Sequence, residues 1–445
     1  MLTDGRISKT KSIKSMGSLH EHIILPLSDL ATGQHVYKYL RLLREAEQWS
    51  PQQMAEFQQQ RLRQLIVYAA KEVPFYQDWI QTHDLNPTTI TLDQLPIVNK
   101  GIMRQEGINR FTAEHFSSKK RIASRSSGST GEPFSFYVSK EAYSVNTAAK
   151  LRTWYQAGYR LGNHYMKIAN GARHGKFKEL QDKINNCLYV PFYSMDDTVL
   201  ASILELIEKR HPLFIRSYPM PLYLLAQYRN KHEDRYHHKP LHVMTTGSTL
   251  PQAYRTEIEQ AFGCDVIDSY SCEGTPNTYE TPVHDGYHIC NYYGIIEVLD
   301  EQGLPVTDGI GRVVSTDLWN LAHPFIRYDT QDLVEVKDGK IQRIMGRECE
   351  SLIVTNGQRY TVHNFVGFFQ EDNRPTKQSV TAYQVVERKD GSITFRLVVN
   401  EQYTPDIEQY IINFWKQQLG IPINVEIVDK IPLMKNNKRL TIVEE

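Results

Sequence analysis

Hydrophobic residues recur at helical spacing in several parts of this chain. The clearest case is the stretch 51–70, where Ser50 is a good helix N-cap and Pro51 suits the first helical position. Its apolar residues fall on one face of a helix: Met54, Phe57, Leu62, Leu65, Ile66 and Ala69. Comparable patterns predict helices over residues 139–157, 197–210, 219–228, 250–262 and 405–418.

Short apolar runs lie between these helices and predict buried strands. They cover residues 164–170, 213–218, 241–247 and 265–270. Because strands and helices alternate here, the pattern indicates a parallel sheet with crossover helices. Ligands of such sheets bind beyond the carboxyl ends of the strands. Gly247 and Tyr270 fall at those ends, so they are candidates for a binding site.

The pattern changes from about residue 287 to short strands at 295–299, 311–316 and 333–336, with a turn at Asp338 and Gly339. Beyond a boundary near Gly346 we expect a second hairpin at residues 390–391, one helix and a final strand near Val425. The sequence therefore predicts an α/β protein. Residues 1–346 form a large domain with parallel sheets, crossover helices and antiparallel strands, and residues 347–445 form a small α+β domain.

Composition narrows the possible partners and location. The 445 residues contain 51 Lys and Arg against 51 Asp and Glu, so no net charge favours nucleic acid or an anionic membrane. No apolar run approaches the roughly 18 residues that a membrane span needs, and the polar, basic residues 1–14 do not resemble a secretion signal. The 5 cysteines are an odd number without framework spacing and are expected to be reduced thiols. We therefore expect a cytoplasmic protein.

The stretch from Ser126 to Gly131 is the most distinctive motif. Four hydroxyl side chains and two glycines, in the order Ser126, Ser127, Gly128, Ser129, Thr130, Gly131, suit a backbone nest for phosphate oxygens. The alternative is a surface turn or flexible linker. Strand-like residues on both sides favour a loop at the end of a hairpin. It is not a Walker loop, because Glu132 and Pro133 stand where that motif has lysine and a hydroxyl residue.

Further polar residues follow the predicted strands. Glu273, just after the strand at 265–270, suits a magnesium ion bridging phosphates, although it could equally be a solvated or capping glutamate. Gly247 and Ser248 would let a planar ring lie against the backbone, with Tyr270 on its other face, unless they form an ordinary loop.

The remaining candidates each have a structural alternative. Asp332 could accept two ribose hydroxyls, or could belong to a structural pair with Arg327. Arg347 could reach the same nucleotide, or could sit in a linker turn. Lys438 lies in a basic tail, where a lysine is usually exposed to solvent. Cys272, His284, His288 and Cys290 include enough potential ligands for zinc, but their spacing matches no standard site.

Taken together and in order, these motifs resemble the adenylate-forming (ANL) superfamily. Within it, the chain is most similar to the branch of phenylacetate–CoA ligase and capsular-polysaccharide-biosynthesis (CapK-like) proteins. The resemblance covers almost everything from residue 25 to 445. It rests on the motifs at 126–133, 246–248, 270–273, 327–332 and 346–347, and on Lys438.

The resemblance implies a role for each candidate. Residues 126–131 would hold the β- and γ-phosphates of ATP, and Glu273 would bind Mg²⁺. Gly247, Ser248 and Tyr270 would frame the adenine, while Asp332 and Arg347 would hold the ribose. Lys438 would come from a mobile small domain to stabilise charge as a carboxylate attacks the α-phosphorus.

The chain departs from the family pattern at several positions. Asp329 stands where the family commonly has arginine, and Gln331 where it has glycine. Cys349 occupies the hinge position, Asn437 replaces the glycine before the terminal lysine, and Ser271 follows Tyr270 where glycine is common. None of these changes removes a core catalytic residue. They bear mainly on the second half-reaction, in which the acyl group passes to an acceptor, and on which acid is the substrate.

The resulting functional hypothesis is an AMP-forming ligase that joins a small-molecule carboxylic acid to coenzyme A. One alternative keeps the adenylation step but passes the acyl group to an amine, an amino sugar of surface-polysaccharide assembly, or a carrier protein. A second alternative is a catalytically silent binding or scaffold relative. The acid should contact residues between Ile168 and Pro221 and the segment after Glu273. Phe192, Tyr193 and Tyr218 suggest apolar or aromatic walls there, although aromatic residues in such places more often belong to the core. The sequence leaves open whether the chain forms a homodimer.

Overall fold

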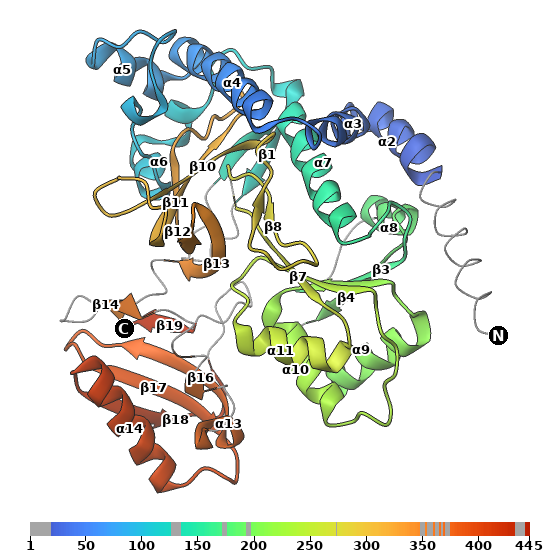
Figure 1. The fold of residues 1–445 in the computed structure, drawn as a ribbon, viewed down its shortest axis with the longest axis vertical. Helices are drawn as coiled ribbons and strands as arrows, with labels where there is room; N and C mark the ends of the chain where they lie inside the picture. The colour runs from blue at the N-terminus through green and yellow to red at the C-terminus, as the bar shows by residue number, and fades with distance from the viewer. Residues whose placement is uncertain are drawn as a thin grey trace.

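A computed structural model describes residues 19–125, 135–170, 176–192, 197–272, 274–347, 352–353, 359–360, 365, 368–369, 374–431 and 441–445. These residues form an N-terminal helical layer, a seven-stranded sheet, a four-stranded antiparallel sheet and a C-terminal α+β unit (Figure 1). The α/β class predicted from the sequence is confirmed. Among the described helices, none combines the length and apolar character that crossing a bilayer requires.

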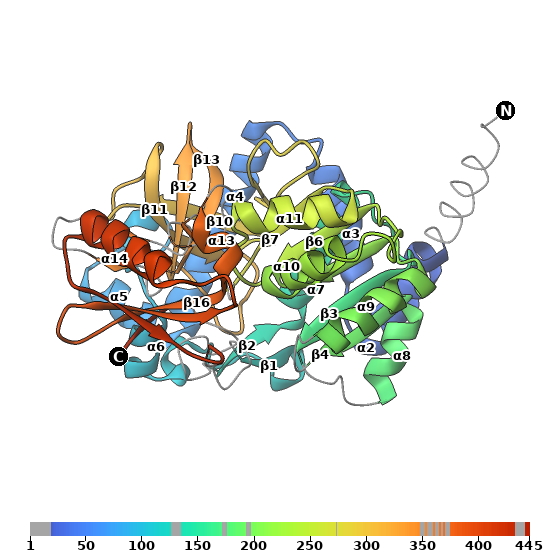
Figure 2. The same cartoon turned by 90° about the horizontal axis from the view of Figure 1, so that it is seen from below.

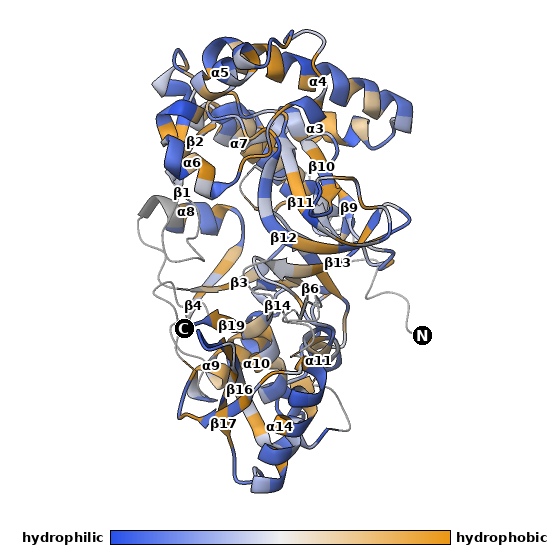
Figure 3. Ribbon diagram, turned by 90° about the vertical axis from the view of Figure 1, so that its left-hand side faces the viewer, coloured by the Kyte–Doolittle hydropathy of each residue, from blue (hydrophilic) through white to orange (hydrophobic). Residues whose placement is uncertain are grey.

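The N-terminal layer is built on the helix predicted from residues 51–70. Ser50 and Gln53 form a capping box at its start, and its buried positions are Leu65, Ile66 and Ala69 on an otherwise largely hydrophilic ribbon (Figure 3). Pro74 starts a further helix, which the sequence pattern did not predict. The elements are η1 (His20–Ile24), α2 (Leu25–Thr32), α3 (Val36–Ala46), α4 (Pro51–Glu72), α5 (Pro74–Thr82), η2 (Leu92–Gln94), α6 (Lys100–Glu106), η3 (Ile108–Phe111) and η4 (Ser118–Lys120).

The seven-stranded sheet has the strand order β4-β3-β5-β6-β7-β8-β9. Its strands from β4 to β7 are parallel, and β8 and β9 continue it in antiparallel fashion. All four strands predicted between residues 164 and 270 belong to it. They are β3 (Tyr165–Asn170), β5 (Phe214–Ser217), β6 (His242–Thr246) and β7 (Val266–Tyr270), joined by β4 (Cys187–Phe192), β8 (Thr278–Tyr279) and β9 (His288–Ile289).

Helices cover both faces of this sheet. Phe214, Met244 and Ile267 share one hydrophobic cluster with residues of α7, whereas the neighbouring Ile215 and Val243 share another with residues of α9, α10 and α11. Alternate positions along each strand therefore face different helices, as the period of a β-strand requires. The helices are α7 (Lys140–Gln156), α8 (Lys176–Ile184), α9 (Asp197–Arg210), α10 (Pro219–Asn230) and α11 (Gln252–Phe262).

Two antiparallel units complete the larger part of the chain. The predicted hairpin pairs β1 (Arg121–Arg125) with β2 (Ser135–Ser139). The second unit has the order β10-β11-β12-β13, and the predicted turn at Asp338 and Gly339 joins its last two strands. Its strands are β10 (Gly294–Leu299), β11 (Gly309–Asp317), β12 (Tyr328–Lys337) and β13 (Lys340–Arg347).

The C-terminal unit is a four-stranded sheet with the order β18-β17-β16-β19, covered by a helix. The prediction that the last strand lies near Val425 was wrong, because β19 follows it and pairs in parallel with β16. A strand of three residues is too short for its pattern to be recognised. The elements are β14 (Leu352–Ile353), β15 (Arg359–Tyr360), α13 (Pro375–Ser379), β16 (Val380–Glu387), β17 (Ile393–Val399), α14 (Pro405–Leu419), β18 (Ile423–Ile427) and β19 (Ile442–Glu444).

The C-terminal unit packs against the large sheet's helices through aromatic side chains. Tyr223 of α10 stacks on Tyr254 of α11 with ring centroids 4.0 Å apart, and both belong to the hydrophobic cluster that contains Tyr383 of β16. Figure 2 shows this unit beside α10 and α11. The proposed boundary at residues 346–347 coincides with the end of β13 and stays a prediction.

His323 is a titratable group in the core of the larger part. It has 0% exposure, and its ring lies 5.1 Å from that of Phe325 and 6.3 Å from that of Phe111. Burial lowers the pKa of His323 to about 3. The folded protein therefore holds this imidazole neutral over a range of pH in which the unfolded chain would protonate it.

We expect this difference to make stability fall as the solution is acidified below about pH 6.5, the ordinary pKa of histidine. A group that is protonated only in the unfolded chain lowers the free energy of unfolding. The loss is about 1.4 kcal/mol for each pH unit below the pKa of that group in the unfolded chain. The loss of unfolding free energy between pH 6.5 and 5 should therefore be about 2 kcal/mol smaller in His323→Gln than in the parent. Urea denaturation at both pH values measures it. His237→Gln, at an exposed histidine, should leave the pH dependence unchanged.

Candidate active site

Two strand ends place the first pair of predicted residues side by side. Strands β6 and β7 are parallel, with Thr246 opposite Ser269, so Gly247 and Tyr270 follow at neighbouring positions of the same sheet edge. Gly247 and Ser248 are exposed, and Tyr270 is half-buried. This edge is the carboxyl end of the parallel strands, where the topology of such sheets places ligands.

A tyrosine that the sequence suggested only as a wall residue contacts Gly247. A Cβ atom on Gly247 would lie 2.8 Å from Cε1 of Tyr218, and the residue has a left-handed φ of +80°. The ring of Tyr218 thus occupies the space that any larger residue would need. Tyr218 follows strand β5 directly, so its position at a strand end was the signal that identifies it.

The hydroxyl of Tyr270 joins the two large sheets. It donates a hydrogen bond of 2.7 Å to Oδ2 of Asp332 on β12, and it lies 3.4 Å from Oγ1 of Thr330. Asp332 is buried, and its backbone N–H donates to the same threonine oxygen at 3.1 Å. Burial first, and then the charge of Asp332, hold the pKa of Tyr270 well above its usual value. The phenol therefore stays protonated and serves as the donor.

The main chain of Arg347 lies next to Asp332. In the β12–β13 ladder, Asp332 and Arg347 are register partners, next to an irregularity at Leu333 and Val334. The described residues thus bring Gly247, Ser248, Tyr270 and Asp332 together with the main chain of Arg347, although these segments are distant in the sequence. The roles that the resemblance implies for them stay predictions.

The other predicted site residues, 126–131, Glu273 and Lys438, lie outside the described residues. Their flanks are described in part. Arg125 and Ser135, which flank residues 126–134, are register partners of the β1–β2 hairpin. Beyond Glu273, Gly274 has a left-handed φ of +71°, and a Cβ there would lie 2.5 Å from Cγ of Phe325. On its other side, the backbone N–H of Cys272 donates to Oγ1 of Thr275 at 2.6 Å.

A buried polar network supports the ends of β6 and β7 from within. Asp268 of β7 accepts hydrogen bonds from Oγ1 of Thr245 at 2.5 Å and from the hydroxyl of Tyr287 at 2.6 Å. Glu280 accepts from the backbone N–H of Asp268 at 3.0 Å and from Arg255 through both carboxylate oxygens. Burial raises the pKa of Asp268 to about 6. The network fixes the strands that present Gly247 and Tyr270.

The structure resolves the alternative for Arg327. Its guanidinium pairs with Glu297 at 3.0 and 3.1 Å and donates to the carbonyls of Asp93 and Leu95. Arg327 is therefore structural, but its partner is a glutamate and not Asp332. Gln331, which stands where the family has glycine, has a left-handed φ of +61°. The backbone shape that favours glycine is thus kept by a residue with a side chain.

The zinc hypothesis has no support from the described residues, which include all four of its proposed ligands. Nowhere in the described ranges do three or more His, Cys, Asp or Glu side chains gather as a metal site. His288 instead lies 2.8 Å from a carboxylate oxygen of Asp285, and Cys290 is enclosed so that burial raises the pKa of its thiol to about 12.

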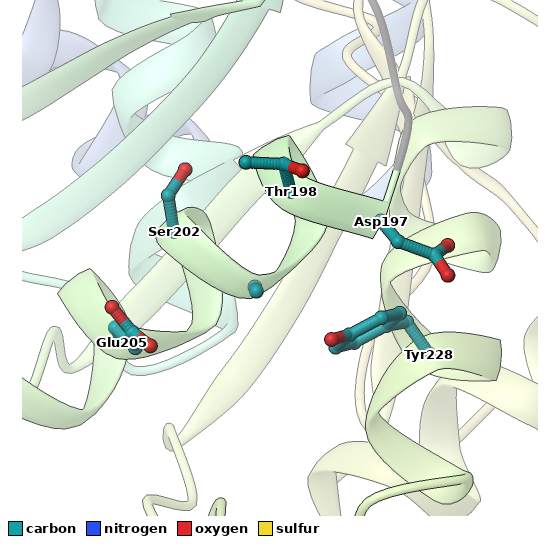
Figure 4. A pocket seen from close by; sticks show the side chains of 6 residues that line it. Asp197, Thr198, Ser202, Glu205 and Tyr228 are labelled. Carbon is teal, nitrogen blue, oxygen red and sulfur yellow. The ribbon is translucent and has the colours of Figure 1, made fainter.

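A hollow on the far side of the large sheet is separate from this site. Helices α9 and α10, which cover the sheet face opposite α7, contribute its lining (Figure 4). It contains two carboxylates and no cation, which makes it a poor place for a nucleotide. The lining residues are Asp197, Thr198, Ala201, Ser202, Glu205 and Tyr228.

We expect Gly247→Ala to destabilise the protein more than a matched glycine change. Gly391 has almost the same φ, +79° against +80°, but no atom lies within 4 Å of the position that a Cβ there would take. Both substitutions carry the left-handed penalty of about 1–2 kcal/mol, and the contact with Tyr218 should add about 1–3 kcal/mol at Gly247 only. Urea denaturation of both variants measures the difference. Equal losses of unfolding free energy in the two variants would show that the Tyr218 ring moves aside for the added methyl group at no cost.

Tyr270→Phe should lower the free energy of unfolding by about 1–3 kcal/mol, because it leaves the buried Asp332 carboxylate without this donor. Chemical denaturation gives the value. Tyr143→Phe, at an exposed tyrosine, is the matched control and should change stability by less than about 0.5 kcal/mol. A Tyr270→Phe variant as stable as the control would mean that water replaces the hydroxyl at no cost.

Two known proteins are similar in sequence to this chain over most of its length. No protein-family model matches the chain. It is 24% identical over 442 residues to protein CapK of Staphylococcus aureus, covering 91% of each chain. It is 22% identical over 394 residues to the phenylacetate–coenzyme A ligase of Thermus thermophilus, covering 83% of this chain and 86% of that one.

Among solved structures, the chain resembles 2-hydroxyisobutyryl-CoA ligase. In the postadenylation state with a bound acyl-AMP, the TM-score is 0.67 at 17% identity, covering 86% of this chain and 88% of the other. The same ligase in its thioesterification state gives a TM-score of 0.55. These likenesses establish the fold.

Proposed function

We propose that this chain is a member of the adenylate-forming superfamily, in the branch of CapK and phenylacetate–coenzyme A ligase, and that it activates a carboxylic acid with ATP. The observation that carries the proposal is the convergence of Gly247, Tyr270 and Asp332 at one sheet edge. These are positions at which the family motifs match this chain. The relatives named above include ligases that join acids to coenzyme A.

The proposed reaction has two steps. In the first, a carboxylate oxygen of the acid attacks the α-phosphorus of ATP. The new oxygen–phosphorus bond forms, the bond to the bridging oxygen breaks, and pyrophosphate leaves with that electron pair. In the second step, the sulfur of coenzyme A attacks the acyl carbon and loses its proton. The bond to AMP breaks, and the products are a thioester and AMP.

Separate groups of residues bind the phosphates of ATP and its adenosine. Ser126, Ser127, Gly128, Ser129, Thr130 and Gly131 hold the β- and γ-phosphates through backbone and hydroxyl donors. Gly247, Ser248 and Tyr270 frame the adenine, while Asp332 and Arg347 hold the ribose. The contact between Tyr218 and Gly247 supports a flat binding surface at this edge, because it leaves no room for a side chain.

Glu273 is the proposed ligand of Mg²⁺. Of the two residues beside it, Cys272 donates its backbone N–H to Thr275, and Gly274 leaves no room for a Cβ next to Phe325. Mg²⁺, when bound, neutralises charge on the phosphates of ATP. Lys438 stabilises the negative charge that develops at the α-phosphoryl group, an effect worth about 3–4 kcal/mol per donor in enzymes of known mechanism.

The acceptor separates this proposal from its alternatives. Coenzyme A is the acceptor we propose, because ligases that use it are among the relatives with the same fold. An amine or a carrier protein would use the same adenylate and differ only in the second step. A silent scaffold relative would bind neither ATP nor an acid.

ATP–pyrophosphate exchange across a panel of carboxylic acids tests the first step. We expect exchange with at least one acid, and we expect Lys438→Ala to lower its rate about 100- to 1,000-fold through the lost electrostatic stabilisation. Glu273→Ala should cause a loss of similar size. Lys435→Ala removes a lysine three positions away and serves as the matched control, with little expected change.

Three outcomes would count against parts of this proposal. Full activity in both Lys438→Ala and Glu273→Ala would contradict their assigned roles. Exchange with no acid, together with no binding of ATP, would favour the scaffold alternative. AMP release that depends on an amine and not on coenzyme A would assign the acceptor to the other enzymatic alternative.

A further inference from the structure

Helices η1 and α2 form one continuous segment that turns charged side chains toward the protein. Glu21 is buried and accepts hydrogen bonds of 2.7 Å from both Arg44 and Tyr155. Eight residues further along, Asp29 is also buried and accepts a hydrogen bond of 2.8 Å from the backbone N–H of Tyr37. The inner side of this segment is therefore held in part by polar contacts of buried carboxylates.

The outer side of the same segment carries large apolar side chains. They recur after four, four and three residues, which places them on one side of a helix, and their exposed fractions are 49%, 52%, 61% and 82%. A helix on a protein surface ordinarily buries its apolar stripe and exposes its charges. Here that arrangement is reversed. The exposed residues are Leu19, Ile23, Leu27 and Leu30.

Helix α8 shows the same reversal next to this segment. Its Asp182 is buried, whereas Leu180 and Ile184, one turn apart, are 54% and 40% exposed. Nε2 of His20 lies 3.1 Å from the carbonyl oxygen of Ile184, so the end of α8 meets the start of η1. Figures 1 and 2 both place α8 on the same side of the molecule as α2. The exposed side chains of the two helices form what we call the apolar face, which consists of Leu19, Ile23, Leu27, Leu30, Leu180 and Ile184.

Basic segments of the sequence adjoin both parts of the apolar face. Residues 1–14, which precede Leu19, contain four lysines and arginines against one aspartate. Residues 173–178, which precede Leu180, contain three lysines and arginines and no acidic residue. The chain as a whole has equal numbers of cationic and anionic residues, so this excess is local. Exposed apolar side chains next to clustered cations are the combination that binds the surface of an anionic bilayer.

We propose that the apolar face docks on the surface of a membrane that contains anionic lipids, with η1, α2 and α8 lying in the interface. The apolar side chains would enter the boundary between headgroups and acyl chains, and the basic segments would contact the headgroups. A second copy of this chain is a poorer occupant, because a symmetric contact would bring the basic segments of the two copies together. The inference goes beyond the proposed function and does not depend on it.

Sedimentation with phospholipid vesicles tests this proposal on the whole chain. The probes are vesicles of phosphatidylcholine alone and vesicles that also contain phosphatidylglycerol at about one lipid in three. The partition coefficient should be at least about tenfold higher for the anionic vesicles at about 0.1 M NaCl, and about 0.5 M NaCl should remove most of that difference.

Leu27→Glu tests the apolar part of the interaction. It should lower the partition coefficient for anionic vesicles at least about fivefold, because a charge would have to enter the acyl boundary. Leu304→Glu is the matched control, since both leucines are 61% exposed, and it should bind within about twofold of the wild type. Thermal denaturation without vesicles should give Leu27→Glu the Tm of the wild type, which separates lost docking from lost folding.

The double variant Lys11→Gln and Lys14→Gln tests the electrostatic part. It should bind anionic vesicles about tenfold more weakly than the wild type and should show a smaller dependence on salt. Lys337→Gln combined with Lys389→Gln removes two exposed lysines elsewhere and should change binding by less than about twofold.

Three outcomes would overturn the proposal and leave the ligase proposal untouched. The first is equal binding of the wild type and Leu27→Glu to anionic vesicles, or no binding by either. The second is a dimer in sedimentation velocity that Leu27→Glu dissociates, because a second copy would then cover the apolar face. The third is vesicle binding that appears only after removal of residues 1–18, which would show that this segment covers the face in the whole chain.

Discussion

The hydrogen bond from Tyr270 to Asp332 crosses the boundary between the seven-stranded and the four-stranded sheet. The two sheets also share hydrophobic clusters, and the candidate site lies where their edges meet. Strand β7 supplies the donor at its last residue and strand β12 supplies the buried acceptor. Because burial and the nearby carboxylate keep the phenol protonated, the contact persists across the pH range in which proteins usually work.

Much of the fold was predictable because its elements are regular. Helix α4 combines a capping box with an apolar stripe, and strands β5, β6 and β7 are short apolar runs between helices. The strand ends then located Gly247 and Tyr270 without knowledge of the fold, since parallel strands place their carboxyl ends on one edge. The motifs and their order supplied the remaining candidates, but only through resemblance to a family.

Other features depend on contacts that no local pattern encodes. Strand β19 is too short to recognise, and its place beside β16 is set by the sheet. Arg327 was weighed as the partner of an aspartate, yet it pairs with Glu297 some thirty positions earlier in the chain.

The short strand β19 also fixes the last described residues in the sheet, through its parallel pairing with β16. Residues 432–440, which include Lys438, lie between Ile431 and Ile442, and both of these isoleucines are buried at 2% exposure. Beyond them, Glu445 accepts hydrogen bonds from Arg396 and Arg388. The described residues on either side of positions 432–440 are thus each held by the C-terminal unit. A fusion or tag that pulls β19 from its sheet would therefore break its parallel pairing with β16 and the ion pairs of Glu445 with Arg388 and Arg396.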